Sequence, residues 1–200
     1  MKRLVIASNN PGKIREIAAL LAPLAIEVVP QSQLGIGEAD EPHGTFVENA
    51  LAKARHASRA SGLPSLADDS GLCVGALGGA PGVRSAHYAG REGSREERDA
   101  RNNRRLLEEL KDDRRAYYAC IMVLARTASD PLPLIAEGIW HGEIARAPRG
   151  ANGFGYDPLF FLGDYDKTAA ELDPAEKNRI SHRGQALARL LELLRDSGRA

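Results

Sequence analysis

Two adjacent carboxylates, Asp68 and Asp69, follow a short apolar run that predicts a strand over residues 65–67. Neighbouring carboxylates are costly to bring together unless a cation or hydrogen-bond donors offset their charges. Mg²⁺ prefers hard oxygen ligands and usually takes one or two carboxylates together with substrate phosphates. The pair at this strand end therefore indicates a metal site, with a carboxylate able to take a proton from water. The alternative interpretation is a turn in which Asp and Ser side chains bond their own backbone.

A second acidic stretch lies upstream, from Glu38 to Glu48. Thr45 and Glu48 have the spacing of a capping box at a helix start, which gives Glu48 a structural role. Glu41 lies in the preceding loop and is the better candidate for a second metal ligand, with Glu38 and Asp68 as the other candidates. The alternative is an acidic loop that is solvated and binds nothing.

The run Ser8–Lys13 connects a predicted strand to a predicted helix. Free backbone N–H groups at a helix N-terminus attract anions, and Lys13 adds a positive charge there. The run is not a Walker A loop, because the first glycine is missing and Ile14 stands at the Ser/Thr position. The alternative is an ordinary helix cap, with Asn10 as the capping residue and Pro11 in the first helical position.

Glycines alternate with aromatic residues in the segment from Gly153 to Pro158. An aromatic face can stack on a nucleobase, and glycine allows close approach of the backbone. Asp157 can accept hydrogen bonds from base N–H groups. Downstream, Lys177 and Arg183 supply cationic donors suited to a keto oxygen or a phosphate. The alternatives are a turn whose aromatics pack inward and charges that are merely solvated.

The elements that must position these residues alternate between strand and helix in the first half of the chain. Apolar periodicity predicts strands over residues 2–8, 26–29, 65–67 and 116–126, and one or two more strands within residues 132–145. Capping residues predict helices that begin at Pro11, Thr45, Ser94, Asp173 and near Ser181. This order predicts an α/β fold with a mixed sheet, and ligands in such folds lie at strand ends.

The charges of the 200 residues cancel, with 27 Lys and Arg against 27 Asp and Glu. This balance argues against a general nucleic-acid coat protein but leaves room for a basic pocket that binds one small polyphosphate. Cys73 and Cys120 lie in apolar stretches and favour buried thiols over a disulfide. No apolar run reaches the roughly 18 residues of a membrane span. We therefore expect a cytoplasmic protein with no membrane or nucleic-acid partner.

Six motifs, in this order, resemble the inosine/xanthosine triphosphate pyrophosphatase family, the pyrophosphatases of dITP, XTP and other non-standard purine nucleoside triphosphates. The motifs are SNNPGK (8–13), TFVENALAKA (45–54), ADDSGL (67–72), LGGAPGVRSA (77–86), GFGYDPLF (153–160) and EKNRISHRGQAL (176–187). Each is weak alone, whereas together they cover nearly the whole chain. The resemblance implies a homodimer in which residues 1–200 form one α/β domain, with a long mixed sheet and two lobes flanking a substrate cleft.

The resemblance also implies Mg²⁺-assisted attack of water at the α-phosphorus of ITP, dITP or XTP. The products are the nucleoside monophosphate and pyrophosphate, so the nucleotide pool is cleansed. Asp69 is implied as general base and metal ligand, with Glu41 as the second ligand and Asp68 as a helper. The residues implied to bind substrate are Ser8, Asn9, Asn10, Pro11, Gly12 and Lys13 for the triphosphate, Ser70, and Phe154, Gly155, Tyr156, Asp157, Lys177, His182 and Arg183 for the purine.

The chain departs from the family pattern at His87, where arginine is usual, and at Arg84, where an aromatic is common. Arg84 can supply the missing charge, or His87 can make this contact pH-sensitive. Two other function classes stay open. One is a catalytically silent nucleotide-binding protein, against which the intact Asp68–Asp69 pair and Lys13 argue, and the other is a pyrophosphatase for modified pyrimidine nucleotides.

Overall fold

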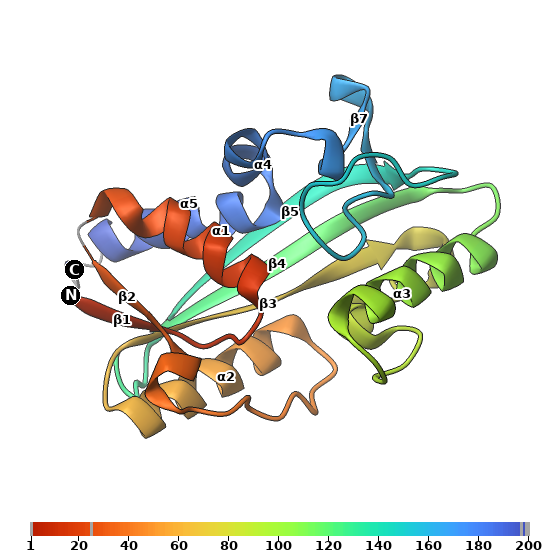
Figure 1. Cartoon of the computed structure of the whole chain (residues 1–200). Coiled ribbons are helices and arrows are strands. Elements are labelled where there is room, and N and C mark those ends of the chain that lie inside the picture. The colour runs from red at the N-terminus through yellow and green to blue at the C-terminus, as the bar shows by residue number, and fades with distance from the viewer. Residues whose placement is uncertain (1, 25, 197, 199–200) are drawn as a thin grey trace. The chain divides into compact units, whose positions relative to one another are not determined.

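The computed structural model describes residues 2–24, 26–196 and 198 (Figure 1). The chain divides into two compact units. The first unit comprises Met1–Asp69, Cys120–Gly138 and His182–Ala200, and the second comprises Ser70–Ala119 and Ile139–Ser181. The prediction of one domain with two lobes and a cleft between them stays a prediction, and each unit is described by itself below.

The helices and strands follow the predicted alternation in the first half of the chain. The strands are β1 (Arg3–Ile6), β2 (Glu27–Pro30), β3 (Ser65–Val74), β4 (Arg115–Ala125), β5 (Leu134–Ile144), β6 (Phe160–Leu162) and β7 (Lys167–Thr168). The α-helices are α1 (Pro11–Leu21), α2 (Phe46–Ser61), α3 (Arg95–Glu109), α4 (Pro174–Ile180) and α5 (His182–Asp196).

Among the described residues, the strands form one seven-stranded sheet in the order β2-β1-β3-β4-β5-β6-β7. Strand β1 pairs with β2 and β3 in parallel, whereas β6 pairs with β5 and β7 antiparallel. The sheet is therefore mixed, which confirms the predicted α/β fold class. Parallel strands need crossover connections, and α1 and α2 supply them between β1, β2 and β3.

Helices cover both faces of the sheet in the first unit. Figure 1 shows α1 and α5 side by side on one face and α2 on the opposite face. Side chains along a strand alternate between the two faces, so each strand contributes to two separate cores. The core that faces α1 and α5 includes Leu4, Ile6, Ile17, Leu21, Leu66, Cys120, Met122, Leu124, Leu187 and Leu190. The core that faces α2 includes Val5, Ala7, Ala50, Ala54, Ala57, Ala67, Val123 and Ala125.

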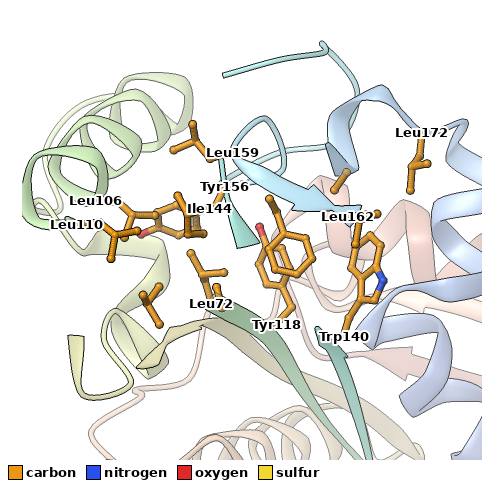
Figure 2. Packing of buried hydrophobic residues seen from close by; sticks show 14 residues of the cluster. Leu72, Leu106, Leu110, Tyr118, Trp140, Ile144, Tyr156, Leu159, Leu162 and Leu172 are labelled. Atoms are coloured by element: carbon orange, nitrogen blue, oxygen red, sulfur yellow. The ribbon is translucent and has the colours of Figure 1, made fainter. Parts of the chain in front are cut away.

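The second unit has an aromatic core of its own, shown in Figure 2. The ring of Phe160 lies 4.6 Å from that of Tyr118 and 5.2 Å from that of Trp140, measured between centroids and with tilted planes. Such tilted pairs stabilise the core beyond the burial of their area, by about 0.5–1.5 kcal/mol. Leu106 of α3 and Leu72 of β3 complete this core.

The predicted helix starts are confirmed by their capping bonds. Asn10 accepts hydrogen bonds from the N–H groups of Gly12 and Lys13, with Pro11 in the first position of α1. The remaining predicted caps are confirmed in the same way, and they are Thr45 for α2, Ser94 with Glu97 for α3 and Asp173 for α4. At α2 the carboxylate of Glu48 bonds the hydroxyl of Thr45, so the capping box is formed only in part.

One strand prediction is too short, and two strands were missed. Residues 65–67 were expected to form a complete strand, whereas β3 continues through Val74. The short strands β6 and β7 were not predicted, because two or three residues are too few to show an alternation.

Both cysteines are free and buried, as expected. No helix of the described residues is both long and apolar enough to cross a membrane.

Candidate active site

Asp68 and Asp69 lie in the middle of β3, so the prediction that they follow a strand end is wrong. Successive side chains of a strand point to opposite faces, and this separates the two carboxylates. Asp68 shares its face with Leu66, toward α1 and α5, and Asp69 shares its face with Ala67, toward α2. The alternation relieves the repulsion that a turn would have forced on them. Each carboxylate therefore needs partners of its own.

The partners of Asp68 come from α1 and α5. Lys13 forms an ion pair with Oδ1 of Asp68, and Nε of Arg183 donates to Oδ2 at 3.0 Å. The guanidinium of Arg183 also bonds Glu16 through Nη1. Burial disfavours the charge of Asp68, but Arg183, Lys13 and Lys53 overcome it and hold the pKa of Asp68 well below its usual range. Asp68 is therefore ionised at neutral pH, in a balanced cluster of four charges.

The partners of Asp69 come from α2. Nζ of Lys53 lies 2.7 Å from Oδ1 of Asp69, and Nδ2 of Asn49 donates to Oδ2 at 3.4 Å. The same ammonium lies 2.7 Å from Oε1 of Glu41. Burial raises the pKa of Asp69, against the opposing influence of Lys53 and Lys13. Of the two carboxylates, Asp69 is thus the one whose affinity for a proton is enhanced, which suits a general base.

The N-terminus of α1 has the geometry of an ordinary helix cap. The side chain of Asn10 takes the N–H groups of Gly12 and Lys13, and Pro11 has none to offer. The Ser8 hydroxyl accepts from the Asn10 amide at 3.1 Å, and Oδ1 of Asn9 accepts from Gln31. The backbone N–H groups of Gly12 and Lys13 are therefore engaged within the cap. Binding of a phosphate by Ser8–Lys13 stays a prediction.

In the second unit, a buried ion pair joins two of the residues predicted to meet a purine. Nζ of Lys177 lies 2.6 Å from Oδ2 of Asp157. The same carboxylate accepts the Phe154 amide at 2.8 Å and, through Oδ1, the Tyr118 hydroxyl at 3.4 Å. Gly153 is required beside it, because a Cβ there would lie 2.0 Å from Asp157 Oδ2 and its φ is +76°. The network fixes the turn that presents Phe154.

The structure separates the predicted purine-binding residues into three groups. Phe154, Gly155, Asp157 and Lys177 lie together, whereas Tyr156 is buried and its hydroxyl donates to the Ser85 carbonyl at 3.0 Å. Tyr156 thus matches the alternative of an aromatic packed inward. His182 and Arg183 begin α5 in the first unit, where Arg183 bonds Asp68 and Glu16. Ser70 follows Asp69 in β3.

Comparison with known proteins identifies the family of this chain and agrees with its fold. The sequence model of the Ham1 family matches residues 4–193. The chain belongs to the Ham1 family. A Ham1 relative named dITP/XTP pyrophosphatase, from Bordetella pertussis, is 64% identical over 200 residues, which cover 99% of this chain and 93% of that protein. Its namesake from Burkholderia pseudomallei is 66% identical over 194 residues, or 96% of this chain and 93% of that protein.

Solved Ham1 structures agree with these sequence matches. The HAM1 protein of Coxiella burnetii has a TM-score of 0.88 at 49% identity and covers 98% of this chain and 100% of its own. The Ham1 protein of Staphylococcus aureus has a TM-score of 0.84 at 39% identity with the same coverage. The resemblance seen in the six motifs is therefore confirmed.

Two residues near the predicted site of this Ham1 chain were missed by sequence reasoning. Lys53 bridges Asp69 and Glu41, and it stands four residues after Asn49 on the face of α2 that packs on the sheet. A polar pair at i, i+4 on a face otherwise made of alanines and one serine was the signal that could have found it. Arg95 lies with its guanidinium carbon 4.8 Å from the centre of the Phe154 ring. It begins a highly charged helix and carried no such signal.

Proposed function

We propose that this Ham1 chain hydrolyses non-standard purine nucleoside triphosphates, namely ITP, dITP and XTP, to the monophosphate and pyrophosphate. Its relatives named dITP/XTP pyrophosphatase supply the substrate class. The observation that carries the proposal is the division of Asp68 and Asp69 between two faces of β3. One carboxylate is held ionised by two cations, and the other has a raised pKa and faces a single lysine.

The residues around Asp69 fit a divalent cation. Asp69 and Glu41 are hard oxygen ligands, and both lie 2.7 Å from the ammonium of Lys53, so a positive charge already sits between them. No cluster of three or more acidic, His or Cys ligands occurs among the described residues. Mg²⁺ suits such a site, because it commonly takes one or two carboxylates and completes its shell with water and substrate phosphates. When bound, Mg²⁺ would neutralise phosphate charge and acidify water.

The chain's own residues perform the remaining tasks in this proposal. Lys13 binds the triphosphate. Asp68 pairs with the Lys13 ammonium, and Arg183 in turn holds Asp68. Asp69 takes a proton from water as the water oxygen attacks the α-phosphorus and the bond to the pyrophosphate oxygen breaks. Phosphoryl chemistry of this kind depends mostly on positioning and charge stabilisation, so prearranged cations account for much of the rate.

The purine is distinguished by the hydrogen-bond donors that it meets. Hypoxanthine and xanthine carry a 6-keto oxygen that can accept from a lysine, an arginine or a backbone N–H. Adenine has an amine there and leaves a buried donor unpaired, at a cost of about 1–3 kcal/mol. We assign the base platform to Phe154, with Lys177 and Asp157 beside it.

Initial rates of pyrophosphate release from ITP, XTP, dITP, dUTP and GTP test the proposal directly. We expect ITP, dITP and XTP to exceed ATP, assayed beside them, by at least roughly tenfold in kcat/KM, the size of one lost or unpaired hydrogen bond, and to require a divalent cation. GTP carries the same 6-keto oxygen, so any discrimination against it must arise at its 2-amino group. A preference for dUTP would favour the pyrimidine alternative. Absence of turnover with tight ITP binding would identify a silent nucleotide-binding protein.

Replacement of Phe154 by alanine is expected to raise KM for ITP roughly tenfold, since stacking of one base on an aromatic ring contributes about 1–3 kcal/mol. The kcat should change much less, because the ring does not touch the reacting phosphate in this proposal. Steady-state kinetics measures both constants. The matched control is Phe161→Ala, which removes another ring that carries a cation, the guanidinium of Arg149 at 5.5 Å. Equal effects of the two variants on KM would refute the platform.

We also propose that the enzyme is a homodimer that acts on the free nucleotides of the cytoplasm. The dimer is implied by the family resemblance, and the cytoplasmic location is the expectation drawn from the composition of the sequence. Sedimentation equilibrium of the full chain measures the first, and a monomer at micromolar concentration would exclude it.

A further inference from the structure

We propose that the buried thiol of Cys120 is a positioning residue, which holds the Asp68 carboxylate in the orientation that presents Lys13 to the triphosphate. The inference rests on the proposed function for its kinetic consequence. Its structural basis does not depend on the substrate, because the contacts lie wholly within the first unit.

Cys120 donates a hydrogen bond from Sγ to Oδ2 of Asp68, at 3.1 Å. Oδ2 also accepts Nε of Arg183 at 3.0 Å, while Oδ1 forms the ion pair with Lys13. The two oxygens of Asp68 thus have different partners. Two donors fix Oδ2, and this leaves Oδ1 turned toward the lysine. A carboxylate can rotate about its last bond, so each donor on Oδ2 restricts that rotation.

Packing alone does not explain why a cysteine stands at position 120. Cys120 shares its face of β4 with Met122 and Leu124, and all three belong to the apolar core that faces α1 and α5. An apolar side chain would serve that core equally well, whereas the contact with Asp68 requires a donor. The exposed fraction of Cys120 is 0%, so water does not supply that donor in its place.

The donor at this position also has to be neutral. Lys13 and Arg183 carry two positive charges, and Asp68 and Glu16 carry two negative charges, so the cluster is already balanced. A further buried cation would lack a counter-charge. The thiol keeps its proton, because burial and the negative charge of Asp68 both raise the pKa of Cys120 well above its usual range.

The consequence for the reaction passes through Lys13. The ion pair with Asp68 sets the position of the Lys13 ammonium. The side chain of Lys13 is 14% exposed, so it can still meet a ligand. Loss of the thiol donor would let the carboxylate, and the lysine with it, sample other positions. We therefore expect weaker binding of the polyphosphate, with little change in the chemical step that Asp69 performs.

The test compares Cys120→Ala, which removes the donor, with Cys120→Ser, which keeps a donor in the same place. We expect Cys120→Ala to raise KM for ITP by about three- to tenfold, the span of one ordinary hydrogen bond, with kcat within twofold of the wild type. Cys120→Ser should restore KM to within twofold. Cys73→Ala is the matched control, since it removes the other buried thiol, and it should leave KM unchanged.

Titration calorimetry with inorganic triphosphate separates this inference from the proposed function. If the wild type binds triphosphate but does not hydrolyse ITP, the proposed function fails. The role of the thiol is still tested, because the dissociation constants of Cys120→Ala and Cys120→Ser for triphosphate can be compared with that of the wild type. Equal affinities of the wild type, Cys120→Ala and Cys120→Ser overturn the inference. Equal weakening of both variants overturns it too, because volume and not the donor would then matter.

A wild type that does not bind triphosphate at all also refutes the role through Lys13. Thermal melting of each variant shows whether it is folded. If Cys120→Ala does not fold, Cys120→Val replaces it, because valine fills the cavity and has no donor. The expectation for Val is the same three- to tenfold weakening that is expected for Ala.

Discussion

Replacement of Asp69 by asparagine is expected to lower kcat for ITP hydrolysis by at least about 10³-fold, within the range that a general base contributes. Asparagine has nearly the same shape and keeps an oxygen toward Lys53, at the cost of the long hydrogen bond that Oδ2 accepts from Asn49. It cannot take a proton from water, and it is a poorer ligand for a divalent cation. Steady-state kinetics with saturating divalent cation measures the loss.

The same substitution is expected to stabilise the metal-free protein. Burial raises the pKa of Asp69, which means that folding disfavours its ionised form. At pH 7 this charge therefore subtracts from the free energy of unfolding, and the neutral amide removes that penalty. We expect a gain on the order of 1 kcal/mol in urea denaturation, the usual size when a strained functional group is neutralised. Lys53 retains Glu41 as its counter-charge.

The control for Asp69→Asn is Glu48→Gln, a change of the same kind on the adjacent helix. Glu48 is exposed and bonds the hydroxyl of Thr45, so its loss should affect the cap of α2 and leave kcat within about twofold. If Asp69→Asn kept more than a tenth of the wild-type kcat, Asp69 would not be the base. A large loss of stability would instead mean that its charge supports the fold.

Much of the local structure could be predicted because its causes are local. Asn10 with Pro11 starts α1, Ser94 with Glu97 starts α3, and Asp173 starts α4, since a capping side chain satisfies N–H groups only two or three residues away. The mixed sheet followed from the alternation of apolar segments. These features need no knowledge of what the rest of the chain does.

The interior of β3 could not be predicted, because its causes are distant in sequence. Two aspartates, a serine and a glycine have the composition of a turn. They form a strand here because Lys13, Arg183 and Lys53 reach them from three helices. The longest of these contacts, from Arg183 to Asp68, spans 115 residues. The two-residue repeat of a strand places Asp68 and Asp69 on opposite faces, but it can be applied only once these residues are known to form a strand.

Replacement of Asp68 by asparagine is expected to destabilise the protein by about 3–5 kcal/mol, the cost of removing one partner from a buried ionic cluster. Arg183 would lose the charge of Asp68 and retain that of Glu16, and Lys13 would lose its ion-pair partner. The side chain of Arg183 is 2% exposed, so water does not compensate for the lost charge. The effect is thus opposite in sign to that of Asp69→Asn, although the two residues are neighbours and the chemical change is the same.

The pH dependence of stability distinguishes the two aspartates further. Arg183, Lys13 and Lys53 overcome the effect of burial and depress the pKa of Asp68, so its contribution is fully present above its unfolded value near 3.8 and is lost as the pH falls below that value. Urea denaturation at pH 7 and pH 3 should therefore show a smaller difference between Asp68→Asn and the wild type at pH 3. Asp113→Asn, which changes an exposed aspartate paired with Arg115, should leave the midpoint at pH 7 unchanged. If Asp68→Asn were as stable as the wild type at pH 7, the cluster would not hold the fold, and the fixed orientation of Lys13 would need another cause.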